Sequence, residues 1–178
     1  RLREVLGTHR GKKQRVPLAV AEREAESVLA YMKSSPAVRE AIIAGSLRRR
    51  RESVGDIDLL AVSDRGTTVT RHFVAYPQFL DVLAQGAKRA SAVLASGLQV
   101  DLRIVPEESF GAALLYFTGS KAYNIELRRR AIARGLKLNE YGLFKGKRRI
   151  AGATEESIYA ALDLPWVPSE QREIDLPQ

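Results

Sequence analysis

The chain begins with one amphipathic stretch and continues with short apolar runs of strand length. Residues 17–33 repeat apolar side chains at i, i+3, i+4 and i+7 positions, and Pro17 suits a first helical turn, so this stretch predicts a helix closed by residues 34–36. Residues 56–62 (DIDLLAV) and 98–105 (LQVDLRIV) are rich in branched apolar residues and have the length of strands. The first hundred residues therefore predict an α/β arrangement.

The other segments of this region carry a weaker pattern. Residues 38–44 form a short β-compatible run that ends at a Gly-Ser pair. Residues 67–84 favour a helix that Pro77 breaks, and residues 87–95 suit either a strand or a helix. The choice between helix and strand stays open at 87–95.

After Pro106 helices and short strands follow each other closely. Gly135 suits the C′ position of one helix, and Glu155 and Glu156 suit the first turn of another. Helices are predicted at 107–116, 121–134 and 154–162, and short strands within 136–150 around a turn at 145–147. The predicted fold class is α/β (α+β), with an α/β lobe at 1–106 that includes a basic N-terminal segment, a smaller α+β lobe at 107–165, and an acidic Pro-containing tail or linker at 166–178.

Composition narrows the possible chemistry. The 178 residues are 45% hydrophobic and 28% charged, which suits a folded core. Cysteine is absent, which excludes disulfides, thiolate zinc sites and cysteine nucleophiles and fits a reducing interior. His9 and His72 are the only histidines and lie far apart, which argues against a Ser-His-Asp hydrolase, so any metal should be a hard ion held by carboxylates. No apolar run approaches membrane-spanning length, so we expect no membrane partner.

The formal charge of +8 is unevenly distributed. Residues 1–15 carry a net +5, residues 16–120 are neutral by count, residues 121–149 carry +8, and residues 150–178 carry −5. Two basic blocks around a neutral middle favour a polyanion-binding protein, because lysine and arginine that neutralise phosphates release counterions. The alternative is that these are solvated faces of an ordinary basic protein.

The most informative stretch joins a Gly-Ser turn to a carboxylate pair. Asp56 and Asp58 point to the same side of a strand, and their mutual repulsion would be relieved by Mg²⁺ or Mn²⁺. Gly45 and Ser46 lead into a short predicted helix whose free N–H groups suit a phosphate, and residues 48–51 are four consecutive arginines. The layout suits a metal-bound triphosphate, whereas a D-x-D pair alone is common in surface strands.

A third carboxylate is expected, because two metal ions about 4 Å apart need more than two bridging groups. Asp101 is the candidate, since it interrupts the apolar strand 98–105 and could lie beside 56–62. The alternative is an edge-strand aspartate that faces water.

A second cluster lies at residues 116–128. Tyr116 and Phe117 precede a Gly-Ser turn, and Asn124 and Arg128 lie four apart on one helix face, where they could contact a sugar, a base and a template strand. Periodicity alone favours the other interpretation, in which the aromatic residues pack in a core and Arg128 is solvated.

Together these motifs resemble the family X DNA polymerases, and most closely the bacterial PolX branch. The resemblance covers residues 10–165. The Gly-Ser and D-x-D elements alone indicate only the wider nucleotidyltransferase superfamily, while YFTGS and NEY single out this family. The matching elements are GS-x-RR at 45–49, GDID at 55–58, Asp101, YFTGS at 116–120 with Asn124 and Arg128, and NEY at 139–141.

The resemblance implies a nucleotidyltransferase-type palm, with a small mixed sheet and flanking helices, followed by a nucleotide- and template-binding subdomain, the thumb. Asp56, Asp58 and Asp101 would be catalytic and would hold two Mg²⁺ or Mn²⁺ ions, and Asp101 would also activate the primer 3′-hydroxyl. The other implied roles are triphosphate binding by Arg15, Ser46, Arg49 and Gly55, a deoxyribose pocket of Tyr116, Phe117 and Gly119, base contact by Asn124, template contact by Arg128, and further DNA contacts by Arg103 and Tyr141.

Two positions depart from the family pattern. Val54 replaces a serine that often helps to bind phosphate, and Lys121 replaces an acidic residue found against the base in a vertebrate repair polymerase. We expect Lys121 to reach a phosphate and to tighten nucleotide binding.

The implied activity is that of a DNA-directed DNA polymerase of the gap-filling repair type, with DNA and dNTP as partners, acting as a monomer in the bacterial cytoplasm at the nucleoid. Because the sequence begins with arginine, we expect a piece of a longer protein that lacks the family's helix-hairpin-helix and PHP domains. Two alternatives stay open: a template-independent nucleotidyltransferase that acts on RNA ends or a small molecule, and a nucleic-acid-binding module without catalysis.

Overall fold

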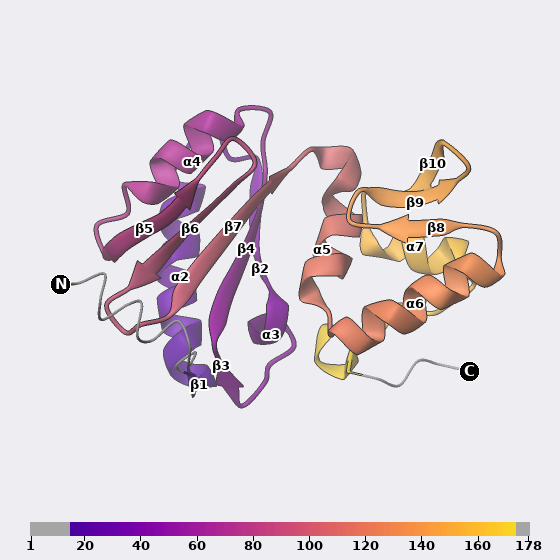
Figure 1. Ribbon diagram of the computed structural model, residues 1–178, viewed down its shortest axis with the longest axis horizontal. Helices are drawn as coiled ribbons and strands as arrows, with labels where there is room; N and C mark the ends of the chain where they lie inside the picture. Colours follow the sequence, from indigo (N-terminus) through magenta and orange to yellow (C-terminus); the bar gives the residue numbers. More distant parts are fainter. Residues whose placement is uncertain (1–14, 174–178) are drawn as a thin grey trace.

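A five-stranded mixed sheet forms the centre of the first lobe in the computed structural model, which describes residues 15–173 (Figure 1). β4 and β7 run parallel, and the other neighbouring pairs are antiparallel. Burial alternates along β7, as expected for a strand with one face in the core. The strands in spatial order are β2 (Glu40–Ala44), β4 (Asp56–Val62), β7 (Gln99–Val105), β6 (Arg89–Leu94) and β5 (Phe79–Gln85).

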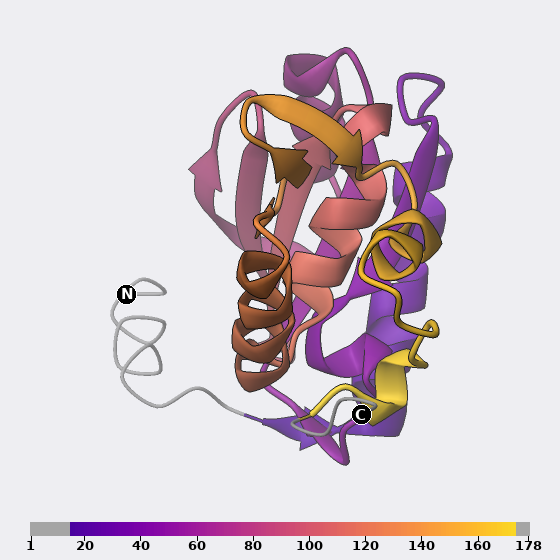
Figure 2. The same cartoon turned by 90° about the vertical axis from the view of Figure 1, so that its right-hand side faces the viewer.

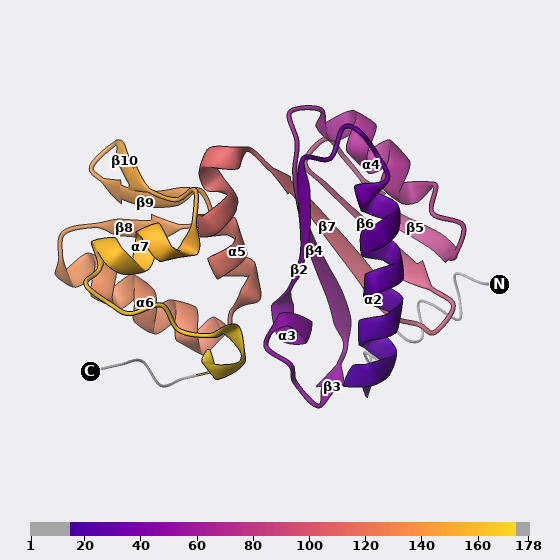
Figure 3. The same cartoon turned by 180° about the vertical axis from the view of Figure 1, so that it is seen from behind.

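Two helices, α2 (Leu18–Lys33) and α4 (Gly66–Val74), cover one face of this sheet (Figure 3). The buried residues of α2 recur at helical spacing, and those of the strands recur at every second position. The core of the first lobe lies between this face and the two helices. It includes Ala21, Ala25, Val28, Met32 and Phe73 of the helices, and Ile57, Leu59, Ala61, Val100, Leu102 and Ile104 of the strands. The intervening residues of β4 and β7 therefore point to the opposite face.

Short elements complete the first lobe. α3 (Gly45–Arg48) follows β2 directly, and β1 (Val16–Pro17) pairs with β3 (Ser53–Val54) in a two-stranded ladder. Three of the four consecutive arginines, Arg49 to Arg51, lie between α3 and β4. The ladder brings residue 15 close to this segment, because Arg15 donates to Ser53.

The second lobe packs helices against a three-stranded antiparallel sheet of order β10-β9-β8 (Figures 1 and 2). Its own core includes Tyr123, Leu127, Leu143, Ile158 and Tyr159. Its elements are η1 (Glu107–Ser109), α5 (Phe110–Thr118), α6 (Lys121–Ala133), β8 (Lys137–Asn139), β9 (Gly142–Lys145), β10 (Arg148–Ala151), α7 (Glu155–Ala161) and η2 (Ser169–Gln171).

Helix α5 joins the two lobes. Ala113 and Leu114 of α5 pack against Ala44 of β2 and Leu60 of β4. Leu60 lies on the same face of β4 as Asp56 and Asp58, because side chains two positions apart share a face. The second lobe thus covers the later part of this face at β2 and β4.

The structure corrects two expectations. Residues 67–84 are not one helix: α4 ends at Val74 and β5 begins at Phe79, because Pro77 cannot continue a helix and β5 pairs along its length with β6. The open choice at 87–95 resolves as a strand. Residues 166–173 do not form a linker, since Val167 and Arg172 are buried in the second lobe; the N-terminal basic segment before residue 15 and residues 174–178 lie outside the described residues.

The other predicted elements agree with the structure. The helix at 17–33, the strands at 38–44, 56–62 and 98–105, and the turn at 145–147 all occur close to their expected positions. Within residues 15–173 no helix has both the length and the apolar character needed to cross a bilayer.

Candidate active site

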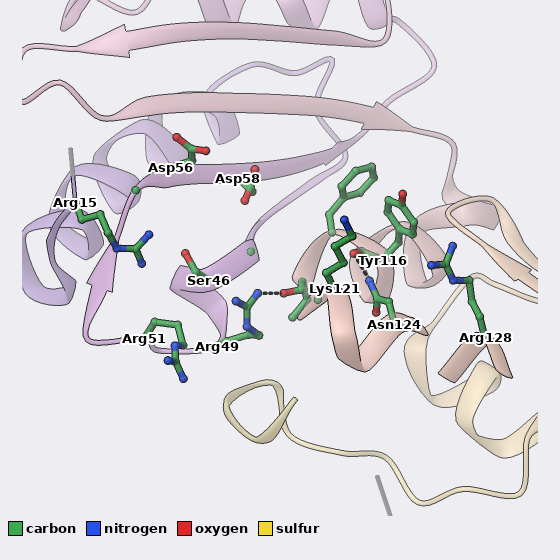
Figure 4. Close-up of a pocket in the computed structure, with 15 residues that line it drawn as sticks. Arg15, Ser46, Arg49, Arg51, Asp56, Asp58, Tyr116, Lys121, Asn124 and Arg128 are labelled. Atoms are coloured by element: carbon green, nitrogen blue, oxygen red, sulfur yellow. Dashed lines mark hydrogen bonds between the residues drawn. The ribbon is translucent and has the colours of Figure 1, made fainter. Parts of the chain in front are cut away.

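A cleft of about 510 Å³ lies between the first lobe and the start of the second (Figure 4). The first lobe contributes carboxylates and arginines, and the second contributes the end of α5 and one side of α6. The lining residues are Arg15, Gly45, Ser46, Arg49, Arg51, Gly55, Asp56, Asp58, Tyr116, Phe117, Thr118, Gly119, Lys121, Asn124 and Arg128. The cleft thus collects twelve of the fifteen residues that the sequence singles out, and it omits Asp101, Arg103 and Tyr141.

The three predicted metal ligands share one face of the sheet. Asp56 and Asp58 lie two positions apart on β4, and Asp101 on β7 is the parallel partner of Asp58. The carboxylate of Asp101 accepts hydrogen bonds from Ser91 Oγ at 2.6 Å and from Gln99 Nε2 at 2.9 Å. Across residues 15–173 no group of three or more His, Cys, Asp and Glu side chains is gathered closely enough to hold a metal ion.

The donor chemistry nevertheless fits Mg²⁺ or Mn²⁺. Carboxylate oxygens are the hard ligands that these ions prefer, and the three aspartates occupy adjacent positions on neighbouring strands. All three are half-buried, so their charges are partly removed from water, and two of them, Asp56 and Asp58, line the cleft.

Gly45 allows the turn into α3 to approach Asp58. Its φ is +65°, a conformation that favours glycine, and a Cβ added at this position would lie 2.2 Å from Asp58 Oδ2. Glycine at this position therefore leaves room for the Asp58 carboxylate.

Arg15 and Gly55 form another edge of the cleft. The guanidinium of Arg15 donates to Ser53 Oγ at 2.9 Å and to the Ser53 carbonyl at 2.7 Å. A Cβ added at Gly55 would lie 3.4 Å from Arg15 Nη1, so the glycine allows the arginine to lie close to the backbone before Asp56.

Arg49 and Arg51 place positive charge along the cleft, and both form ion pairs with Glu173. Arg49 donates to the Thr118 carbonyl and, through Nε, to Glu173 Oε2 at 3.0 Å. Arg51 Nη1 lies 3.7 Å from Glu173 Oε1. The C-terminal segment therefore places a carboxylate at the arginine end of the cleft.

Arg48 is not among the residues that line the cleft, and its side chain links the two lobes. Its two terminal nitrogens donate to Glu155 at 2.8 and 3.0 Å, and one also donates to Thr118 Oγ1 at 2.9 Å. Arg172 donates two further bonds to the same carboxylate. Burial alone would raise the pKa of Glu155, but the hydrogen bonds from Arg172 and Arg48 outweigh it and lower the pKa to about 2.

The second-lobe side of the cleft is built by the YFTGS segment and α6. Tyr116 and Phe117 make an edge-to-face contact with centroids 4.9 Å apart, and Asn124 Nδ2 donates to the Tyr116 carbonyl at 2.7 Å (Figure 4). Tyr116 is 36% exposed, so it is not a core residue of the second lobe. Ser120 caps α6 by accepting from the Tyr123 N–H.

Two predicted DNA contacts lie outside the cleft lining. Arg103 stacks its guanidinium over the Phe117 ring at 4.5 Å, which places it next to a lining residue. Tyr141 is 58% exposed between β8 and β9. The residue-specific assignments missed Arg51, Thr118 and Glu173; the run of arginines was a signal for the first, whereas nothing local indicated the last.

The fold and the cleft define a nucleotidyltransferase-type palm followed by a second, smaller lobe. The DNA polymerase beta palm model matches residues 15–134, and the DNA polymerase beta thumb model matches residues 113–173. The chain therefore belongs to the DNA polymerase beta family, the family X DNA polymerases, as the motif resemblance indicated. The predicted fold class is confirmed as well.

Several curated proteins are similar to this chain. The DNA polymerase/3'-5' exonuclease PolX of Bacillus subtilis (strain 168) is 33% identical over 174 residues, which cover 96% of this chain and 30% of that protein. The DNA polymerase lambda of Rattus norvegicus is 27% identical over 74% of this chain and 28% of its own length. The DNA-directed DNA/RNA polymerase mu of Homo sapiens is 42% identical over 42% of this chain and 16% of its own length. The chain thus spans less than a third of each of these relatives.

Proposed function

We propose that this chain is the catalytic palm and thumb of a DNA-directed DNA polymerase of the gap-filling repair type. It would transfer a nucleotide from a dNTP to a primer 3′-hydroxyl with release of pyrophosphate. One observation carries the proposal: a single cleft has arginines at one end and two aspartates of the D-x-D pair along its wall. Membership of the family X polymerases supports it.

Asp56, Asp58 and Asp101 would hold two Mg²⁺ or Mn²⁺ ions. When bound, such ions lower the pKa of the primer hydroxyl and neutralise the triphosphate. The aspartates themselves would orient the hydroxyl beside β4 and β7, and Asp101 would lie nearest to it. Because the carboxylates are fixed on two paired strands, their positions would change little during the reaction. Such preorganised charges favour electrostatic stabilisation of the transition state.

The arginine end of the cleft would bind the triphosphate. Arg49 presents a planar donor set suited to phosphate oxygens, and Ser46 and Arg15 line the same wall. Lys121 begins α6 and also lines the cleft, which supports a role in tightening nucleotide binding. If Lys121→Ala leaves dNTP affinity unchanged, this role of Lys121 is wrong.

The second lobe would hold the sugar, the base and the template. Tyr116, Phe117 and Gly119 would enclose the deoxyribose, with Tyr116 near the 2′ position and so disfavouring ribonucleotides. Asn124 would reach the incoming base. Arg128, Arg103 and Tyr141 would contact DNA.

DNA is the partner that the charge distribution favours. Ten of the 29 basic residues lie within 121–149, on α6, the three-stranded sheet and their connections. Phosphate neutralisation by such residues makes binding steeply dependent on salt. We propose that the chain acts as a monomer in the cytoplasm.

Primer extension separates this function from its alternatives. Templated and untemplated primers should be compared in Mg²⁺ and in Mn²⁺, with dNTPs and rNTPs in parallel. The proposal predicts templated addition of dNTPs; rNTPs are included because one relative is named a DNA/RNA polymerase. Equal addition without a template would favour the template-independent nucleotidyltransferase, and no addition with intact DNA binding would favour the non-catalytic module.

A further inference from the structure

Asp101 belongs to a row of polar residues that crosses three strands. Its partner on β4 is Asp58 and its partner on β6 is Ser91. The next row on the same face pairs Asp56 with Gln99. The half-buried face that carries the aspartates therefore also carries two neutral hydrogen-bond donors, Ser91 and Gln99.

Both neutral side chains donate to the same oxygen. Ser91 Oγ lies 2.6 Å and Gln99 Nε2 lies 2.9 Å from Asp101 Oδ1. A carboxylate oxygen has two lone-pair sites, so two donors account for the hydrogen-bonding capacity of Oδ1. Within residues 15–173 no hydrogen bond to the second oxygen, Oδ2, accompanies these two, and neither donor is cationic, so neither forms an ion pair with Asp101.

We infer that Ser91 and Gln99 are positioning residues, which fix the Asp101 carboxylate through Oδ1 so that Oδ2 serves the metal site. This inference rests on the proposed function. Ligating carboxylates are generally hydrogen-bonded by outer partners, and loss of such a partner costs 10–100-fold in metal affinity or activity. Without these donors the Asp101 side chain would rotate freely, and metal binding would have to restrict it.

The competing explanation is that the two bonds only satisfy polar groups on the sheet. In that case their loss would alter stability without altering metal affinity. Metal binding measured without turnover distinguishes the two roles, because a purely structural contact would not change it.

The chain offers a closely matched control. Ser96 Oγ donates to Glu24 Oε2 at 2.8 Å, so Ser96→Ala also removes a serine-to-carboxylate bond from a half-buried serine. Glu24 lies on α2, on the opposite side of the sheet from the aspartates. Ser91→Thr retains the hydroxyl and serves as the conservative variant.

The test titrates Mn²⁺ into the whole chain and follows free Mn²⁺ by electron paramagnetic resonance, with thermal unfolding measured for every variant. We expect Ser91→Ala and Gln99→Ala to weaken Mn²⁺ binding by roughly 10-fold or more. Ser91→Thr and Ser96→Ala should bind as wild type does. The Mg²⁺ concentration for half-maximal primer extension should rise in the same two variants.

Two failures remain distinguishable. If Asp101→Ala binds as much Mn²⁺ as wild type does, or if wild type binds none, the proposed metal site is wrong. If wild type binds normally, and Ser91→Ala and Gln99→Ala bind equally well, the positioning role is wrong while the proposed function stands. Tighter binding in Ser91→Ala, or equal weakening in Ser96→Ala, also contradicts the positioning role.

Discussion

Arg172 donates two hydrogen bonds to Glu155, at 2.7 and 3.0 Å, and both side chains are buried. Arg48 donates to the same carboxylate from the end of α3, so Glu155 ties the first lobe to α7 and to the C-terminal segment. This arrangement also fixes the position of Glu173, the residue after Arg172, beside Arg49. A contact remote from the aspartates thereby shapes the arginine end of the cleft.

Loss of the Glu155 carboxylate should be strongly destabilising. Glu155→Gln leaves the buried guanidinium of Arg172 without its counter-charge, and breaking a buried pair in this way costs about 3–5 kcal/mol. Glu156→Gln is the matched control, because Glu156 is the exposed neighbour on the same helix. Urea unfolding at neutral pH measures the stability of both variants. Equal unfolding midpoints for Glu155→Gln and Glu156→Gln would contradict the stabilising role of the buried pair.

The same carboxylate predicts a dependence of stability on acid. The folded-state pKa of Glu155 is lowered from 4.5 to about 2, so its contribution is complete above about pH 4.5 and is lost as the pH falls towards 2. Because a tenfold change in proton affinity corresponds to about 1.4 kcal/mol, the free energy of unfolding should fall by roughly 3 kcal/mol over this range. Urea unfolding at several pH values should show this decline in wild type and a shallower decline in Glu155→Gln. Parallel curves for the two proteins would show that Glu155 does not cause it.

Gly45→Ala should impair activity more than stability. The new Cβ would meet Asp58 Oδ2 at 2.2 Å, and the carboxylate, as the end of a side chain, can turn away at little cost to folding. A displaced catalytic group can lower the rate on the order of 100-fold. Gly135→Ala is the matched control, since Gly135 also has a positive φ, +72°, but nothing lies within 4 Å of its added Cβ.

Both alanine variants should lose about 1 kcal/mol from the backbone conformation. Only Gly45→Ala should lose primer extension, measured as single-turnover rate. A similar rate loss in Gly135→Ala, or none in Gly45→Ala, would contradict the account of Asp58.

Glu173→Gln should strengthen triphosphate binding. In wild type the Glu173 carboxylate competes for Arg49 and Arg51, and its side chain is 39% exposed, so the competition is moderate. We expect a fall of about 2–5-fold in the dNTP dissociation constant at low ionic strength, and a smaller effect as salt screens the charges. Glu170→Gln changes the net charge equally at an exposed position of η2 and should have no such effect. An unchanged or weaker affinity in Glu173→Gln would contradict the competition.

Local patterns predicted the parts of the site that are local in sequence. The Gly-Ser turn, the D-x-D pair and the YFTGS segment each place their residues within a few positions, and all of them line one cleft. The sequence also placed Asp101 on a strand beside β4, because an aspartate within an apolar strand stands out.

Pairing with other parts of the chain decided the structure of two segments that the sequence predicted wrongly. β5 exists as a strand through its ladder with β6, which the helical propensity at 67–84 did not reveal. The acidic segment at 166–173 packs on the second lobe because Arg172 binds Glu155, seventeen residues earlier in the chain. The composition of this segment is typical of linkers and does not indicate such a partner. The hydrogen bonds that hold Asp101 likewise depend on strand register.

The proposed mechanism depends on Asp101, so the decisive experiment is primer extension by Asp101→Ala, with DNA binding measured in parallel. Single-nucleotide addition on a templated primer should fall at least about 1,000-fold, equivalent to about 4 kcal/mol of barrier, because one carboxylate of the catalytic face is lost. DNA affinity should stay close to that of wild type, because the basic residues of the second lobe are unchanged. Extension at a near wild-type rate would contradict the assignment of Asp101 and the mechanism built on it.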